Sequence, residues 1–120
     1  MDSSKLPERL RRRAEEIEKQ PSLDKVREFL GAYLFDAVSL EEAREDLQRT
    51  AAWGTWNLKL ELRAFDAVLD EPQAPGVLMR MVASDANWVL DDLSDGAAAA
   101  FLRQVANILR EVIAEADRSR

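Results

Sequence analysis

The sequence predicts an all-α, single-domain bundle of about five helices. Apolar residues recur every three or four positions along most of its 120 residues, which is the spacing of one helix face. Only four glycines and four prolines interrupt this pattern. A chain of this length buries about two-thirds of its unfolded surface, which is enough for one core. We therefore treat residues 1–120 as one domain, with a peripheral charged helix over 1–20 and a core bundle over 22–117.

The first predicted helix runs from about Pro7 to Gln20. Proline is favoured in the first turn of a helix, and a second proline, Pro21, disfavours helical backbone at the residue before it. The apolar stripe is thin and consists of Leu6, Leu10, Ala14 and Ile17. Acidic and basic side chains spaced four apart cover the rest of this helix. We expect it to lie at the edge of the bundle.

The next two helices have clear start signals. Ser22 can cap the second helix. Its apolar face contains Leu23, Val26, Phe29, Leu30, Tyr33 and Leu34. Gly31 inside this helix costs about 1 kcal/mol relative to alanine, so we expect it to serve close helix packing. Ser39 and Glu42 form a capping box for the third helix, and Gly54 is a suitable stop.

Residues 56–63 fit both a strand and a helix. Apolar and polar residues alternate from Trp56 to Arg63, as in a half-buried strand. The positions Leu58, Leu62, Phe65 and Leu69 also recur at helical spacing. This second pattern is longer, and leucine, lysine, glutamate and arginine all favour helices. We therefore predict a helix.

The last third of the chain starts with a turn at residues 71–76, where proline and glycine gather. Residues 77–82 predict a short helix, and residues 84–93 predict a bend with Trp88 and Leu90 turned inward.

The final helix, capped by Ser94 or Asp95, has the strongest periodic signal in the chain. Its apolar face contains Phe101, Leu102, Val105, Ile108, Leu109, Val112 and Ile113. Each fully buried member stabilises the fold by about 1.5–3 kcal/mol, so this helix should anchor the core.

Composition favours a binding protein over an enzyme. Residues 22–95 contain fifteen acidic and seven basic side chains, and the whole chain has a net charge of −6. The chain has no histidine and no cysteine, so it lacks the usual proton shuttle, the usual thiol nucleophile and most transition-metal ligands. We predict no catalytic activity, no cofactor and no metal site. The negative charge opposes binding to nucleic acid and to anionic membranes.

The start of the chain is charged and has no apolar run, unlike a signal peptide. No window approaches the length of a membrane span. We expect a cytoplasmic protein.

Ten residues are predicted to contact a partner. Eight are acids from the crowded middle of the chain, and two are aromatic side chains that could anchor an interface. They are Tyr33, Asp36, Glu41, Glu42, Glu45, Asp66, Asp70, Trp88, Asp91 and Asp92. Trp88 lies close to three acids in sequence, as an anchor with a charged rim would. Of the three tryptophans, Trp53, Trp56 and Trp88, we expect at least two to fill the core.

One group of carboxylates permits an enzymatic alternative. On a helix, Glu41 lies next to Glu45, and Glu42 lies next to Asp46. These paired acids resemble half of the magnesium site of all-helical nucleotide pyrophosphohydrolases, and magnesium accepts all-oxygen ligands. The matching acidic pair on the following helix is missing. A magnesium-dependent nucleotide pyrophosphohydrolase is therefore a distant alternative.

Three segments resemble a family of small bacterial immunity proteins from contact-dependent growth inhibition systems. The first is Phe29-Leu30-Gly31-Ala32-Tyr33-Leu34, the second is Ser39-Leu40-Glu41-Glu42-Ala43, and the third runs from Ala100 to Arg110. Residues 35–38 depart from the family's pattern.

This resemblance implies a non-enzymatic protein that binds and neutralises a cognate toxin domain. We expect a monomer or weak dimer. An acidic surface suits a basic toxin such as a nuclease. A generic helical interaction or regulatory module stays open as an alternative.

Overall fold

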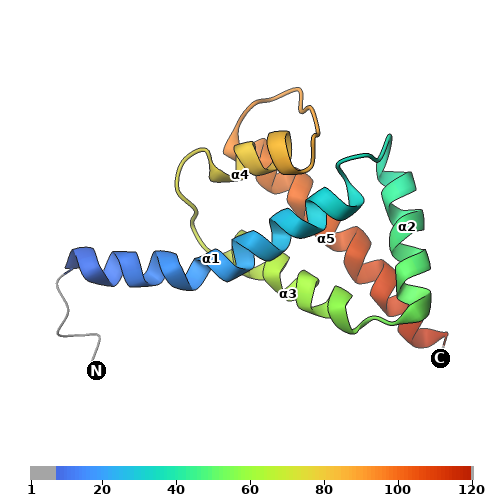
Figure 1. Cartoon of the computed structure of the whole chain (residues 1–120). Helices are drawn as coiled ribbons and strands as arrows, with labels where there is room; N and C mark the ends of the chain where they lie inside the picture. Colours follow the sequence, from blue (N-terminus) through green and yellow to red (C-terminus); the bar gives the residue numbers. More distant parts are fainter. Residues whose placement is uncertain (1–7, 120) are drawn as a thin grey trace.

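The computed structural model describes the backbone of residues 8–119 and the side chains of residues 20–119. All regular elements in this part of the chain are helical (Figure 1). They are α1 (Glu8–Tyr33), α2 (Leu40–Trp53), α3 (Trp56–Asp70), α4 (Val77–Arg80), the π-helical turn η2 (Met81–Asp85) and α5 (Asp95–Arg118). The prediction of an all-α, single-domain bundle is confirmed.

Helix α5 is the centre of the bundle. Helices α2, α3 and α4 all pack against it, and α1 packs against α3 and η2. Its buried side chains include Phe101, Leu102, Val105, Leu109, Val112 and Ile113, while Ile108 is partly buried. The predicted face is therefore the one that anchors the core. Between α1 and α3, the ring of Phe29 meets the edge of Phe65 at a centroid distance of 5.1 Å.

Two predicted serine caps are confirmed. The hydroxyl of Ser39 accepts a hydrogen bond from the backbone N–H of Glu42 at 3.1 Å. The hydroxyl of Ser94 accepts one from the N–H of Ala97, also at 3.1 Å. Each bond satisfies an amide that has no partner within the first turn of a helix. Gly54 follows the last residue of α2, as predicted.

Asp95, the other residue that the sequence allowed as the cap of α5, has a different role. Its carboxylate accepts the backbone N–H of Gly76 at 2.8 Å and that of Met79 at 3.1 Å. These two bonds, and Arg80 to a smaller extent, lower the pKa of Asp95. Gly76 has a φ of 85°, which favours glycine. Asp95 thus ties the start of α4 to the first turn of α5.

The predicted break between two helices at Pro21 is wrong. Helix α1 is continuous from Glu8 to Tyr33 and contains Pro21. Proline removes one backbone hydrogen bond and crowds the carbonyl four residues earlier, but these effects stay local. Burial of the half that follows proline holds the helix in place, through Leu23, Val26, Phe29 and Leu30. The predicted start at Pro7 lies outside the described residues.

The ambiguous segment at residues 56–63 is helical, because it forms the first half of α3. Leu58 and Phe65 are buried, and Leu62 and Leu69 are partly buried against the core. The helical pattern is therefore the correct one, since its period matches the face turned toward α1 and α5.

Two predictions about packing are wrong. Gly31 is exposed, and a Cβ atom at this position would meet nothing within 4 Å, so it serves no close approach of helices. Trp53 and Trp56 are 93% and 72% exposed, so most of the tryptophans lie outside the core. Each stands two positions from a buried residue, Ala51 or Leu58, and two positions turn a helix by about 200°. The rings therefore point to solvent.

Candidate partner-binding surface

Two connecting loops expose large hydrophobic side chains. In the loop from α1 to α2, Phe35 is 46% exposed and Val38 is 84% exposed. In the loop from η2 to α5, Val89 is 91% exposed and Leu93 is 74% exposed. Both loops lie at the top of Figure 1. We define the loop surface as these four side chains and the acids among them: Phe35, Asp36, Val38, Val89, Asp91, Asp92 and Leu93.

A polar contact joins the two loops. The side-chain amide of Asn87 donates to the carbonyl oxygen of Phe35 at 3.5 Å. Asn87 has a φ of 52°, a left-handed conformation that asparagine adopts more readily than most residues. This turn lets the chain leave η2 and pass beside the end of α1.

The turn η2 also departs from regular helix. The N–H of Ala86 bonds to the carbonyl of Met81 at 3.2 Å, a spacing of five residues. Such π-turns are rare and occur often at functional sites. Met81, Val82 and Ala86 are buried, so core packing holds this irregular turn.

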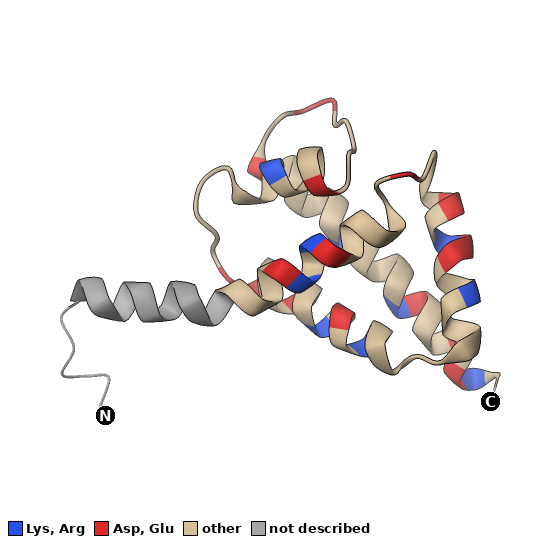
Figure 2. Ribbon diagram, in the orientation of Figure 1, with Lys and Arg blue, Asp and Glu red and all other residues tan. Residues whose placement is uncertain are grey.

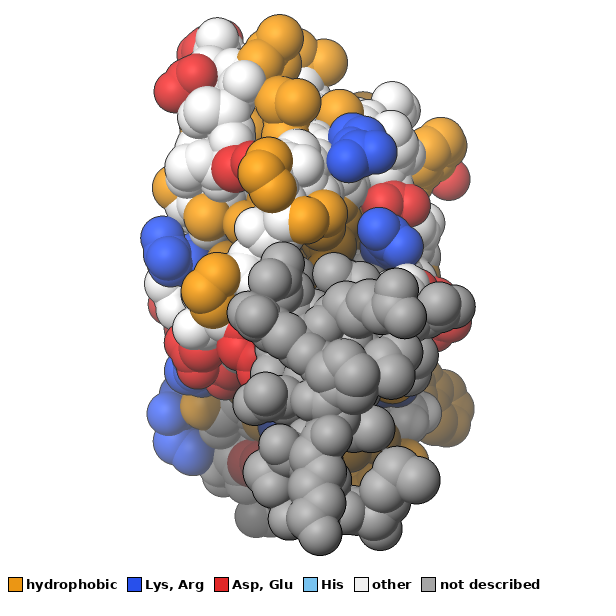
Figure 3. All heavy atoms as spheres, turned by 90° about the vertical axis from the view of Figure 1, so that its left-hand side faces the viewer, with side chains coloured by type: hydrophobic (Ala, Val, Ile, Leu, Met, Phe, Trp, Pro, Cys, Tyr) orange, Lys and Arg blue, Asp and Glu red, His pale blue; other side chains and the backbone are white. Residues whose placement is uncertain are grey.

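A small apolar pocket lies between η2 and the loop that follows it. Its volume is about 140 Å³. Its lining includes Met79, Val82, Ala83, Trp88, Leu90 and Leu93, with Asp92 also at the pocket. Trp88 packs on Phe101 of α5 at a centroid distance of 5.3 Å, and both Trp88 and Leu90 are partly buried, as predicted. Figure 3 shows hydrophobic side chains gathered over the upper part of one side of the molecule.

Four of the ten predicted contact residues lie at or beside the loop surface. Asp36, Asp91 and Asp92 belong to it, and Trp88 lies in the pocket wall. Three more, Glu41, Glu42 and Glu45, lie in the first turns of α2, which begins just after the first loop (Figure 2). Glu41 and Glu45 are exposed, while Glu42 is partly buried.

The other three predicted residues lie elsewhere. Asp66 on α3 forms an ion pair with Arg110 of α5 at 2.9 Å. Asp70 is exposed at the end of α3. Tyr33 is partly buried, and its hydroxyl donates to Thr50 at 3.1 Å, which joins α1 to α2. Asp66 and Tyr33 therefore stabilise contacts between helices.

Sequence reasoning missed the exposed hydrophobic residues Phe35, Val38, Val89 and Leu93. Their signal was a position just before a serine-capped helix, in a segment where apolar residues fit no helical period. No helical period turns an apolar side chain in such a segment toward the core, so it is a candidate for exposure to solvent. The predicted acids around them, Asp36, Asp91 and Asp92, are exposed.

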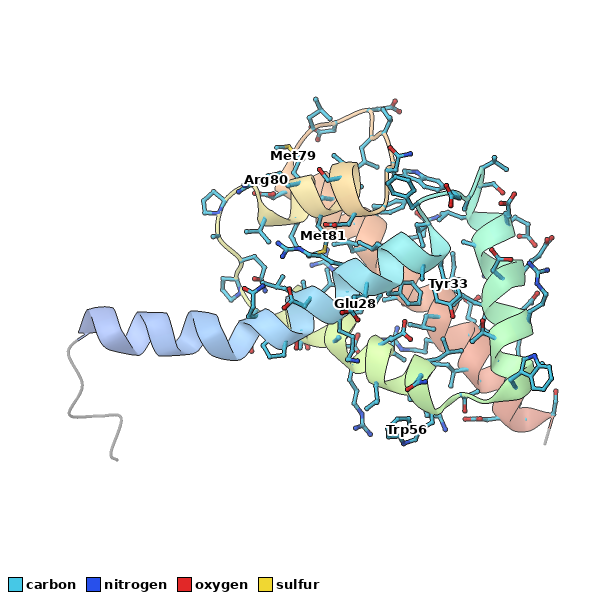
Figure 4. All side chains as sticks on the ribbon, viewed as in Figure 1. Glu28, Tyr33, Trp56, Met79, Arg80 and Met81 are labelled. Atoms are coloured by element: carbon cyan, nitrogen blue, oxygen red, sulfur yellow. The ribbon has the colours of Figure 1, made fainter. Side chains whose placement is uncertain are left out.

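A second exposed apolar region lies where α2 meets α3. We call Trp53 and Trp56 the tryptophan edge; Figure 4 shows Trp56 pointing away from the bundle. Between these rings, buried Thr55 donates to the carboxylate of Asp117 at 3.0 Å, and Lys59 pairs with the same carboxylate at 3.0 Å. The charges nearest this edge are therefore of both signs. A pocket of about 360 Å³ between α2 and α5 is lined by Ala52 among others.

A polar pocket of about 270 Å³ lies between α1 and α3. Lys25, Glu28, Tyr33, Asn57 and Glu61 are among its lining residues; Figure 4 labels Glu28 and Tyr33. Burial raises the pKa of Glu61, the negative charge of Glu28 raises it further, and Lys25 opposes both. The lysine thus partly compensates the two carboxylates, and the pocket has mixed charge.

Within the described residues, no three side chains of His, Cys, Asp or Glu converge in a way that could hold a metal ion. The magnesium-dependent hydrolase stays a prediction. None of the helices in the described part of the chain is long and apolar enough to cross a bilayer. Comparison with protein-family models, curated proteins and solved structures finds no match to the chain.

Proposed function

We propose that the protein is an immunity protein that binds and neutralises a cognate bacterial toxin domain, with no catalytic activity of its own. The observation that carries the proposal is the loop surface, where two loops far apart in sequence together expose four large hydrophobic side chains. Exposed apolar side chains bordered by charged residues are typical of protein-binding sites.

The negative charges around the loop surface favour a basic partner. Asp36, Asp91 and Asp92 are exposed, and Glu41 and Glu45 follow on α2. A basic partner domain would be attracted to these carboxylates during encounter, which speeds association and sets orientation. A nuclease domain with a basic cleft is such a partner. The net charge of −6 on the whole chain also favours a positively charged partner.

Two of the segments that resemble immunity proteins lie on either side of the loop from α1 to α2. The first segment, residues 29–34, ends α1, and the second, residues 39–43, begins α2. The loop between them carries Phe35, Asp36 and Val38, which form one half of the loop surface. These two segments border the proposed contact region, whose residues 35–38 themselves depart from the family's pattern. The position of the segments beside this region supports a role in toxin binding.

The test is a pull-down with tagged full-length protein from its native host, at low and high salt. We expect a basic toxin domain among the captured proteins, and co-expression of the protein should suppress the toxicity of that domain. The association rate should fall as salt rises, because the attraction is screened. Capture of an acidic partner, or turnover of a nucleotide by the pure protein, would contradict the proposal.

The tryptophan edge supports a second candidate, a helical interaction module that contacts another copy of itself or a second protein. Two exposed indole rings are large contact areas at low entropic cost. Sedimentation of the wild type and of Trp53→Ser/Trp56→Ser at increasing concentration separates this candidate from the first. A weak dimer lost in the variant would support it.

A further inference from the structure

We propose that the pocket between η2 and the following loop receives one phenyl-sized apolar ring of the partner, next to a basic side chain that pairs with Asp92. The inference rests on the proposed function, because the partner delivers the ring. It adds a specific recognition element to the loop surface, namely a phenylalanine beside an arginine or lysine.

The size of the pocket sets the occupant. At about 140 Å³ it is close to the cavity of about 150 Å³ that holds a benzene molecule in an apolar protein interior. One aromatic ring fills such a space. Met79 in the wall suits this occupant, because a methionine sulfur contacts aromatic rings favourably and its flexible chain adapts to their shape. Trp88 offers a second aromatic contact.

The lining restricts the polarity of the occupant. Most of the lining is apolar, as at Val82, Ala83 and Leu90, and its one uncharged polar side chain, Asn87, donates to the carbonyl of Phe35. A charged group inserted among the apolar side chains would lose hydration. Asp92 is the charged residue at this pocket, and it is exposed. The hydroxyl of Ser94 donates to its carboxylate at 3.1 Å. A cationic side chain beside the ring would therefore meet an oriented carboxylate.

The wall of the pocket is preformed. Trp88 packs on Phe101, and Ala86 and Val82 are buried in the core. The outer side is different, because Val89 and Leu93 are largely exposed there. A ring that enters from solvent would contact these two side chains and remove them from water. A rigid pocket surrounded by exposed apolar residues that exclude water is the usual setting of a binding hot spot.

The test uses three capped dipeptides as probes, with amide and indole resonances of the full-length protein as the readout. They are N-acetyl-Phe-Arg-amide, N-acetyl-Phe-Glu-amide and N-acetyl-Ala-Arg-amide. We expect the first probe to bind with a millimolar Kd and to shift the resonances of Val82, Ala83 and Trp88. The second should bind about threefold or more weakly, because its carboxylate faces Asp92. The third should cause no saturable shift.

Two matched variants locate the probe. Ala83→Phe fills the pocket and should abolish the shifts caused by Phe-Arg. Ala52→Phe is the control, because Ala52 is also an exposed alanine that lines a pocket, between α2 and α5. It should leave binding unchanged. Asp92→Asn should remove the preference for Phe-Arg over Phe-Glu while the ring still binds.

The outcomes separate this inference from the proposed function. Equal responses to Phe-Arg and Ala-Arg, or shifts centred on Trp53 and Trp56, would overturn the inference. A toxin domain that binds wild type and Ala83→Phe equally would overturn it too, and leave the immunity function standing. Saturable Phe-Arg binding at Ala83, in a protein that neutralises no toxin, would support the pocket and contradict the proposed function.

Discussion

The loop surface and the tryptophan edge both expose large hydrophobic side chains, but they differ in what lies beneath. Under the loop surface are a pocket, a π-turn and a left-handed asparagine, with carboxylates around it. The tryptophan edge lies on the ends of two regular helices, joined by the bonds of Thr55 and Lys59 to one carboxylate. Exposure alone therefore does not identify a binding site. Irregular backbone, a mostly apolar pocket and charges of one sign distinguish the first region.

The physical origin of the two regions also differs. Trp53 and Trp56 are exposed because their helical positions turn them away from the core. The loop residues are exposed although their neighbours Trp88 and Leu90 are turned inward, so the chain there alternates between core and solvent. The loop is held in place by the core contacts of Trp88 and Leu90, whereas a helix end is held by its own backbone hydrogen bonds. Four measurements test this comparison.

The largest expected effect is on stability, from the residue beneath Trp88. Phe101→Ala should lower the free energy of unfolding by about 3–5 kcal/mol, because it leaves a cavity in the core under the loop surface. Trp53→Ala should change it by less than about 0.5 kcal/mol, because that ring is in solvent. Urea unfolding measures both. Similar losses in the two variants would show that the edge is as well packed as the loop support.

The next effect is on partner binding. Val89→Ser/Leu93→Ser should weaken binding of the captured partner by about a hundredfold, because burying a valine or leucine side chain contributes about 1.5–3 kcal/mol and a tenfold change in Kd is about 1.4 kcal/mol. The matched control, Trp53→Ser/Trp56→Ser, should alter the Kd by no more than about twofold. Surface plasmon resonance gives the affinities, and thermal unfolding checks that both variants are folded. The reverse result would make the tryptophan edge the partner-binding site.

A smaller effect tests how the tryptophan edge is held. Thr55→Val removes the hydroxyl that donates to Asp117 and should cost about 1 kcal/mol of stability, a typical value for one hydrogen bond. Thr55→Ser keeps the hydroxyl and is the control. Hydrogen exchange should accelerate at residues 53–58 and stay unchanged in the loop surface. Faster exchange in both regions would mean that they are coupled.

The smallest effect is on the pH dependence of stability. It concerns the hydrogen bonds of Asp95 to the start of α4, where Met79 lines the pocket. The pKa of Asp95 is lowered in the folded protein by the amides of Gly76 and Met79. Its stabilising contribution is therefore complete above the unfolded pKa of about 3.9 and is lost as pH falls through the lower folded pKa. Asp95→Asn should flatten this acid-side decline. Thermal unfolding between pH 2 and pH 5 measures it, with Asp70→Asn as the matched control.

The candidate site was only partly predictable. Trp88 and the acids Asp91 and Asp92 stood out because their residue types mark anchors and charged rims. Phe35 and Val38 did not, because their partner loop lies about fifty residues away in sequence. Their proximity depends on the contact of Asn87 with Phe35, which no local pattern encodes.

By itself, the sequence determined the helices α2, α3 and α5 and the face that each buries. Serine caps and apolar period are local signals, and they act within one or two turns of chain. Tertiary structure alone decided that α1 continues through Pro21, that Asp95 caps α4, and that two loops form one surface. These outcomes depend on contacts between distant segments, whose burial outweighs local preference.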